Sequence, residues 1–156
     1  MMQTEHKEWV DRLFPGQPPA LPAALMLEEA GELVQALSKS AQERVYGKES
    51  RYRTVDWDEK LRDAVGDCAI AACSLCNAND WNYAELAGSY VTQTLDDPMY
   101  TVADIVQAAV YQVLDPHDKP NVSMFLGWLR CLCSTLELDF EECVRTTWER
   151  VKQRTR

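Results

Sequence analysis

The sequence lacks any long run of hydrophobic residues, and no stretch approaches the length needed to cross a lipid bilayer. The first residues, Met-Met-Gln-Thr-Glu-His-Lys-Glu, are polar and contain no signal-peptide core. Basic residues are also scarce, because 16 Lys and Arg stand against 25 Asp and Glu and leave a formal net charge of −9. We therefore expect a cytoplasmic protein that binds neither a membrane nor duplex nucleic acid, since the latter requires a broad basic surface.

Glycine is scarce as well, with 6 residues, and no segment alternates convincingly between polar and apolar residues as a half-buried strand does. Apolar residues recur instead at the spacing of helices. A chain of 156 residues is long enough for one domain with a substantial core and leaves little room for a second. The sequence therefore predicts an all-α fold in which residues 1–156 form a single helical bundle.

Helices are expected between breaks that are rich in proline, asparagine and aspartate. They cover residues 1–14, 22–46, 56–76, 82–95, 102–114, 122–136 and 139–154. Residues 32–37 (Glu-Leu-Val-Gln-Ala-Leu) resemble residues 104–109 (Asp-Ile-Val-Gln-Ala-Ala), and a weaker echo links residues 75–85 with 132–142. The likeness is consistent with two pseudo-repeated three-helix units, but ordinary helical patterning produces the same likeness by chance.

Cysteines lie inside the apolar helical runs rather than in loops, at positions Cys68, Cys73, Cys76, Cys131, Cys133 and Cys143. In a chain of this length we expect them to be reduced core residues and not a disulfide framework. Cys73 and Cys76 have the spacing of a zinc half-site, and Cys131 and Cys133 offer a second one. Helical, apolar surroundings do not suit such a site, so the core interpretation is preferred.

One predicted helix carries three glutamates among apolar positions. Glu28, Glu29 and Glu32 are separated by three or four positions, or are adjacent, so they project from neighbouring turns. The residues expected to pack inward are Leu25, Leu33, Val34 and Leu37. Carboxylates this close repel one another unless a cation lies among them, and Mg²⁺ or Mn²⁺ prefers oxygen ligands. The alternative is an acidic face that is merely solvated.

A second acidic pair follows one loop later, where Asp63 and Asp67 are one helical turn apart. Gly66 would let the neighbouring helix approach closely, and if that helix is 22–46 the two acidic faces meet. Such a cluster needs cations, which on a polyphosphate stabilise developing negative charge and activate a water. The sequence thus predicts a Mg²⁺ site, with Mn²⁺ as an alternative, whose ligands are Glu28, Glu29, Glu32, Asp63 and Asp67.

The same residues resemble a known family. Glu28-Glu29-Ala-Gly-Glu32 and Ala64-Val-Gly-Asp67 are similar to the EExxE…ExxD signature of the MazG-like all-α nucleoside triphosphate pyrophosphohydrolases. The resemblance implies a Mg²⁺-dependent enzyme that cleaves (deoxy)nucleoside triphosphates between the α and β phosphates. It implies that Glu28 or Glu29, Glu32 and Asp67 bind the metal, and that a carboxylate not fully used by the metal orients or deprotonates the attacking water.

The sequence departs from that signature at one position. Ala64 stands where the first acid of ExxD is expected, and Asp63 lies one residue earlier on a side chain one methylene shorter than glutamate. Asp63 shares a helix face with Asp67, so it could take the place of the missing acid. If it does not, the chain is a catalytically weakened nucleotide- and metal-binding module. If the acids are merely solvated, it is a helical interaction protein.

Basic and aromatic residues near these acids are candidates for binding the nucleotide. They are Lys60, Arg53, Lys152, Arg154 and Trp57. The last helix, which also contains Arg150, resembles the basic tail of small members of the same family. Arginine and lysine suit phosphate oxygens and tryptophan suits stacking on a base, but each residue taken singly is more typical of a solvated or packed side chain.

Partners other than the nucleotide are suggested only by the helical pattern. Amphipathic helix pairs usually find a partner, so we expect a homo-oligomer, a dimer or larger. His6, near the chain terminus, and His117, in a proline-flanked loop, are isolated and receive no role.

Overall fold

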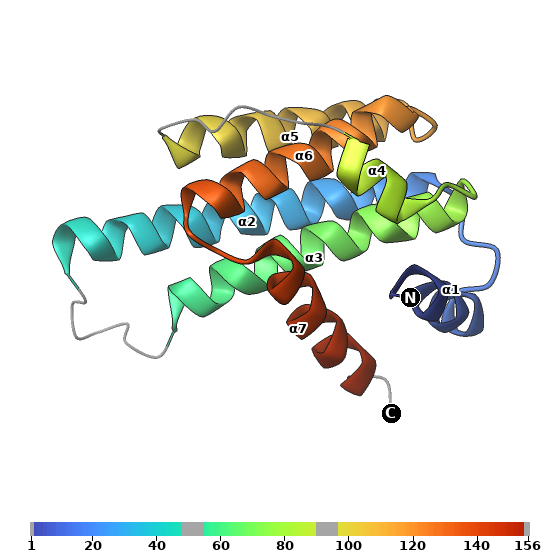
Figure 1. The fold of residues 1–156 in the computed structure, drawn as a ribbon, viewed down its shortest axis with the longest axis horizontal. Coiled ribbons are helices and arrows are strands. Elements are labelled where there is room, and N and C mark those ends of the chain that lie inside the picture. The colour runs from blue at the N-terminus through green and yellow to red at the C-terminus, as the bar shows by residue number, and fades with distance from the viewer. Residues whose placement is uncertain (1, 48–54, 90–96, 155–156) are drawn as a thin grey trace.

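The computed structural model describes residues 2–47, 55–89 and 97–154, and these are helical except for short connections (Figure 1). In chain order the helices are α1 (Met2–Leu13), α2 (Ala20–Tyr46), α3 (Trp57–Ala78), α4 (Tyr83–Ser89), α5 (Pro98–Leu114), α6 (Lys119–Thr135) and α7 (Phe140–Gln153). No strand occurs within these ranges, so the all-α prediction is confirmed. Nor does any helix in them have the length and apolar character required to span a bilayer.

Aspartate side chains begin four of the helices. Backbone N–H groups in the first turns of α3, α5, α6 and α7 donate hydrogen bonds to Asp56, Asp97, Asp118 and Asp139. Pro98 and Pro120 occupy first-turn positions, where proline costs no helical hydrogen bond. For this reason α5 begins at residue 98 rather than 102, and α6 begins at residue 119 rather than 122.

Two predicted segments extend beyond the described residues. The helix predicted over 82–95 is seen as α4, which ends at Ser89, and residues 90–95 lie outside the described part. The predicted loop 47–56 is described only at its two ends.

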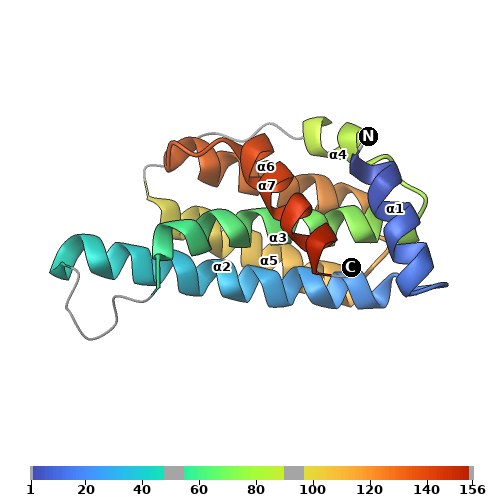
Figure 2. The same ribbon diagram turned by 90° about the horizontal axis from the view of Figure 1, so that it is seen from below.

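The helices form two antiparallel pairs that pack on each other (Figures 1 and 2). The first pair is α2 with α3, the second is α5 with α6, and α5 packs against α2. The shorter helices cover the outside, since α4 lies on α6 and α7 crosses α3. Each predicted three-helix unit thus places its last helix on the middle helix of the other, although the internal repeat itself stays a prediction.

Helix α3 is the most surrounded element, because α1, α2, α4, α6 and α7 all contact it. Its buried side chains are mostly small and include Ala64, Gly66, Cys68, Ala69, Ala72 and Cys73. Small residues let several helices approach one helix at once. All six cysteines are free and buried, so the prediction of reduced core residues is confirmed. The acidic residues of α3 therefore stand on a closely packed support.

Candidate metal and phosphate site

The buried stripe of α2 confirms Leu33 and Leu37 as inward-facing residues, and Val34 is half-buried against the core, but the prediction for Leu25 is wrong. The members of this stripe recur at helical spacing and are Met26, Ala30, Leu33 and Leu37. Leu25, which the pattern predicts to face inward, is 38% exposed. Each residue turns the helix by about 100°, and at this turn of α2 Met26 faces the core while Leu25 faces outward. Glu29, next to Ala30, therefore lies at the border of the core.

Glu29 is the glutamate that its surroundings affect most. It is half-buried, whereas Glu28 and Glu32 are exposed. Burial raises the pKa of Glu29 to about 7, with further contributions from the negative charges of Asp67, Glu32 and Glu28. Asp67 belongs to α3, so the structure brings acids of α2 and α3 within electrostatic range of each other.

Asp67 interacts with charges of both signs. Its pKa is raised, first by burial and then by Asp63 and Glu32, while Arg150 and Arg154 act in the opposite direction. Its side chain is 26% exposed, so water screens these charges only in part. Burial is therefore the main cause of the raised pKa of Asp67, and the two arginines act against the charges of Asp63 and Glu32.

Gly66 marks the closest approach of another helix to α3. A Cβ atom at this position would lie 2.1 Å from Thr147 Oγ1 and 2.7 Å from the backbone oxygen of Cys143, both on α7. The prediction that Gly66 lets the 22–46 helix approach is therefore wrong, because the approaching helix is α7. A glycine in a helical pattern indicates a close contact but not which of several neighbours makes it.

The approach of α7 places Arg150, one turn after Thr147, on the aspartates of α3. Its Nη1 forms an ion pair with Asp63 Oδ2, and its Nη2 lies 3.6 Å from Asp67 Oδ2. The side chains of Arg150 and Asp63 are 31% and 19% exposed, so this pair is partly shielded from solvent. Asp63, the suggested replacement for the missing acid, thus has a cationic partner.

Lys152 and Arg154, the other basic residues near the end of α7, interact with different acids. The Lys152 ammonium donates hydrogen bonds to Glu5 of α1 and to Glu149, on the side of α7 that faces α1. Arg154 follows the last turn of α7, and its charge lowers the pKa of Asp67. Of the two α7 residues predicted to bind substrate, Arg154 is thus the one whose charge reaches the acids.

Three further predicted substrate-binding residues belong to the loop and to the start of α3. Trp57 is half-buried in the first turn of α3, and Lys60 is exposed one turn before Ala64. Arg53 lies outside the described residues. Their part in nucleotide binding stays a prediction.

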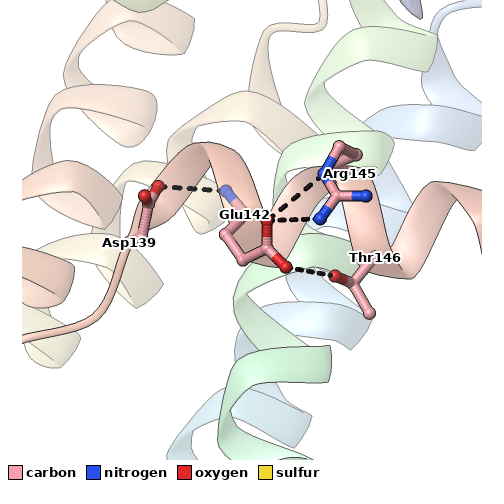
Figure 3. Close-up of polar contacts among 4 residues, drawn as sticks. All are labelled: Asp139, Glu142, Arg145 and Thr146. Carbon is pink, nitrogen blue, oxygen red and sulfur yellow. Dashed lines mark hydrogen bonds and ion pairs between the residues drawn. The ribbon is translucent and has the colours of Figure 1, made fainter.

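The first turn of α7 is held by its own side chains (Figure 3). Asp139 accepts a hydrogen bond from the Glu142 backbone N–H, and the Glu142 carboxylate accepts hydrogen bonds from Arg145 and Thr146. The Arg145 side chain is 66% exposed. Arg145 and Arg150 thus share a helix but have different partners, which makes Arg145 a natural reference for experiments on Arg150.

A hollow of about 600 Å³ lies beside Asp63, between the start of α3 and the start of α7. Its acidic lining residues are Asp56, Glu59, Asp63, Glu137, Asp139 and Glu142, and its basic one is Arg62. Phosphate groups would be repelled from this hollow unless cations accompanied them. The polyphosphate of a nucleotide is therefore better matched to the Arg150 and Arg154 side of α7.

The acids of α2 and α3 do not converge on one point. Within residues 2–47, 55–89 and 97–154, no three His, Cys, Asp or Glu side chains converge in a way that could hold a metal ion. The glutamates of α2 would have to turn toward Asp67 about their side-chain bonds, which have several staggered settings. The predicted Mg²⁺ or Mn²⁺ site therefore stays a prediction.

A buried polar network that the sequence pattern does not predict lies at the other end of α3. His6 is 1% exposed, with Nε2 3.1 Å from Ser74 Oγ and Nδ1 3.0 Å from Asn77 Nδ2. Burial lowers the pKa of His6 to about 4. His6 therefore does have a role, in the core. The spacing of His6 and Val10, which are both buried on α1, is the sequence signal that could have revealed it.

The same junction connects α1 to α7. Trp148 of α7 packs against the rings of His6 and Trp9, and its Nε1 donates a hydrogen bond to Glu5 Oε2 over 2.9 Å. Figure 2 shows the end of α7 directed toward α1. Because Arg150 is two residues after Trp148, α1 helps to hold the helix segment that brings Arg150 to the acids.

No family model, no curated protein and no solved structure matches the chain. The resemblance to the MazG-like enzymes therefore rests on the sequence itself, chiefly on the acidic motif of residues 28–67 and less on the last helix.

Proposed function

We propose that Glu28, Glu29 and Glu32 of α2 and Asp67 of α3 bind Mg²⁺, and that the protein hydrolyses (deoxy)nucleoside triphosphates to the monophosphate and pyrophosphate. The observation that carries the proposal is the excess of negative charge between the two helices. Burial and like charges raise the pKa of both Glu29 and Asp67, although Arg150 lies nearby. A divalent cation would relieve this repulsion.

The available donors suit such a cation. All of them are carboxylate oxygens, which Mg²⁺ and Mn²⁺ prefer, and a guanidinium already lies against Asp63 and Asp67. When bound, the metal would polarise phosphate oxygens and lower the pKa of a bound water. Asp63 is not among the proposed metal ligands, because it forms an ion pair with Arg150.

The side chains of the protein would perform two tasks in the reaction. Glu29 is the candidate for the group that takes a proton from the attacking water, through a carboxylate oxygen that the metal does not use, because it is half-buried next to Asp67 whereas Glu28 and Glu32 are exposed. The water oxygen attacks the α-phosphorus, the bond from that phosphorus to the bridging oxygen breaks, and pyrophosphate leaves. Arg154 and the solvent-facing edge of Arg150 would neutralise charge on the phosphates.

Pyrophosphate release from a panel of dNTPs and NTPs, with and without Mg²⁺, tests the proposal. We expect Mg²⁺-dependent release that Glu32→Ala and Asp67→Asn abolish. Glu59→Gln, which removes an exposed carboxylate from the first turn of α3, is the control and should retain activity. If the protein neither releases pyrophosphate nor binds a nucleotide, the proposal fails and a helical interaction protein is favoured.

A second candidate function is nucleotide binding without turnover. The ion pair between Asp63 and Arg150 favours it, because position 64 carries alanine and Asp63 is not free to replace the missing acid. Mg²⁺-dependent binding of a nucleotide, measured by calorimetry, without any pyrophosphate release would select this candidate.

We also propose that the protein forms a homo-oligomer through α5. The exposed apolar residues of this helix are Met99, Tyr100, Val110, Tyr111, Val113 and Leu114, and its one charged residue is Asp104. Two copies that each carry a charge of −9 repel each other least across an uncharged surface. Light scattering should give the mass of a dimer or larger, and Tyr111→Lys with Leu114→Lys should reduce it. A monomeric native chain would contradict this.

A further inference from the structure

The Arg150 side chain lies near two carboxylates, those of Asp63 and Asp67, which are one turn apart on α3. The Nη1 atom is in close contact with Asp63 Oδ2, whereas Nη2 is 3.6 Å from Asp67 Oδ2, beyond ordinary hydrogen-bonding distance. The guanidinium is therefore within hydrogen-bonding reach of Asp63 and beyond it for Asp67.

The position of this guanidinium is set by backbone packing. The contact between Gly66 and Thr147 leaves no room for a Cβ atom, so it fixes the height of α7 along α3. Asp67 directly follows Gly66, and Arg150 follows Thr147 by one turn. The hydrogen bond from Trp148 to Glu5 holds the opposite side of α7. Arg150 can thus adjust its side chain but cannot withdraw from the aspartates with its helix.

Position 64 explains why Asp63 differs from the motif. Ala64 is 4% exposed and belongs to the buried face of α3, so an acid there would be buried against the core. Asp63 projects toward Arg150 instead. Asp63 is therefore better explained as the ion-pair partner of Arg150 on α7 than as a metal ligand that replaces the acid missing at position 64.

A divalent metal on Asp67 would lie within a few ångströms of the Arg150 guanidinium, and the two positive charges would repel each other. The longer contact, between Arg150 and Asp67, is the one that would break when a metal binds Asp67. We propose that Arg150 and a divalent metal compete for Asp67, and that Asp63 is the anchor that keeps Arg150 on α3 when Asp67 binds the metal. This rests on the metal site in the proposed function and adds how that site is controlled.

Binding of Mn²⁺ alone to the full chain, followed by the electron paramagnetic resonance signal of free Mn²⁺, tests the competition. Arg150→Gln should bind Mn²⁺ about tenfold more tightly than the native chain, within the usual range of coupling between sites. Arg150→Lys keeps the positive charge but cannot contact both aspartates as a guanidinium does, so its Mn²⁺ affinity should lie between those of the native chain and Arg150→Gln. Arg145→Gln removes the same charge from the exposed side of α7 and should change the affinity by less than about twofold.

The role of Asp63 is tested in the same assay. Asp63→Asn should still bind Mn²⁺, whereas Asp67→Asn should not. Loss of Mn²⁺ binding in Asp63→Asn that adding Arg150→Gln does not restore would make Asp63 a ligand and overturn its role as an anchor.

A measurement on the native chain covers the case in which Arg150→Gln does not fold. Addition of Mg²⁺ should shift the side-chain ¹⁵N signal of Arg150, assigned by its absence in Arg150→Lys, and should leave that of Arg145 in place. Equal Mn²⁺ affinities of the native chain and Arg150→Gln, or an Arg150 signal that stays fixed as Mg²⁺ binds, would overturn the competition alone. Absence of Mn²⁺ binding in both proteins would overturn the metal site as well.

Discussion

At Ser74 and Asn77, α3 carries polar groups whose hydrogen bonds to α1 are made, whereas at Asp67 it carries a carboxylate with several acidic neighbours. His6 is buried, whereas Glu29 and Asp67 are only half-buried and Glu28 and Glu32 are exposed. In the first, each donor faces an acceptor. In the second, burial and like charges raise the pKa values of Glu29 and Asp67.

The difference separates a structural cluster from a functional candidate. A buried network with its hydrogen bonds made stabilises the fold and holds α1 in place. A cluster with uncompensated charge costs stability, and a ligand of opposite charge can recover that cost. The same helix thus supports both kinds of cluster, about two to three turns apart.

The largest effect is expected at the contact that places α7 between the two clusters. Gly66→Ala should lower the free energy of unfolding by about 3 kcal/mol, because the new methyl group would overlap Thr147 and a backbone oxygen. Urea unfolding followed by circular dichroism measures it. Gly31→Ala on α2 is the matched control. Its Cβ would meet no atom within 4 Å, so this change should stabilise the protein by up to about 1 kcal/mol.

A smaller effect is expected from acid at the His6 network. The backbone N–H of Tyr83 donates to Gln3 Oε1, and Gln3 Nε2 donates to Asn77 Oδ1. The Asn77 amide nitrogen must therefore donate to His6 Nδ1, which leaves the proton of a neutral ring on Nε2, facing Ser74. Protonation of Nδ1 would set two donors against each other.

This network should make the protein less stable in acid. Because the folded-state pKa of His6 is about 4 and its ordinary value is 6.5, its contribution is complete above pH 6.5 and is lost as the pH falls toward 4. We expect a loss of about 2 kcal/mol in unfolding free energy, measured by urea titration across that range. His6→Gln should remove this part of the slope, and Arg12→Gln on the same helix should keep it. An unchanged slope in His6→Gln would mean that other groups cause it.

The smallest effect on the free energy of unfolding is expected at Glu29, and its dependence on pH is opposite to that of His6. The Glu29 pKa of about 7 lies above the ordinary value of 4.5, so its contribution to stability is complete below pH 4.5 and is lost as the pH rises through 7. In buffer with a chelator at pH 8, Glu29→Gln should raise the unfolding free energy by about 1 kcal/mol, after allowance for solvent screening. The same substitution should abolish pyrophosphate release. Glu59→Gln should change neither quantity, and a destabilised Glu29→Gln would show that the charge at Glu29 is compensated.

Much of the fold could be predicted from local patterns, and the errors had local causes. The pattern predicts the first residue of α2 to within two positions and that of α3 to within one. The predicted starts of α5 and α6 are too late because Pro98 and Pro120 lie in segments that read as breaks, although proline is favoured in a first helical turn. Leu25 was misplaced because the apolar stripe could be drawn in more than one way around α2.

The candidate site was predictable only in part. Spacing alone identified the acids of α2 and α3, since helical periodicity sets which residues share a face. Spacing did not select Arg150 over Lys152, because the two residues lie close together on α7 and only its crossing of α3 decides which one meets Asp63. His6 was missed for a similar reason, as its partners are 68 and 71 residues away.

The sequence by itself determined that the chain is helical and where its carboxylates gather, because capping, helical periodicity and charge are properties of neighbouring residues. Only the tertiary structure decided what surrounds those carboxylates. At Gly66, α7 packs closely against α3, and Glu5 of α1 accepts a hydrogen bond from Trp148 of α7. This packing places Arg150 of α7 beside Asp63 and Asp67. Which groups are buried, and which charges meet, depends on the packing of helices far apart in the chain, and no local spacing contains that information.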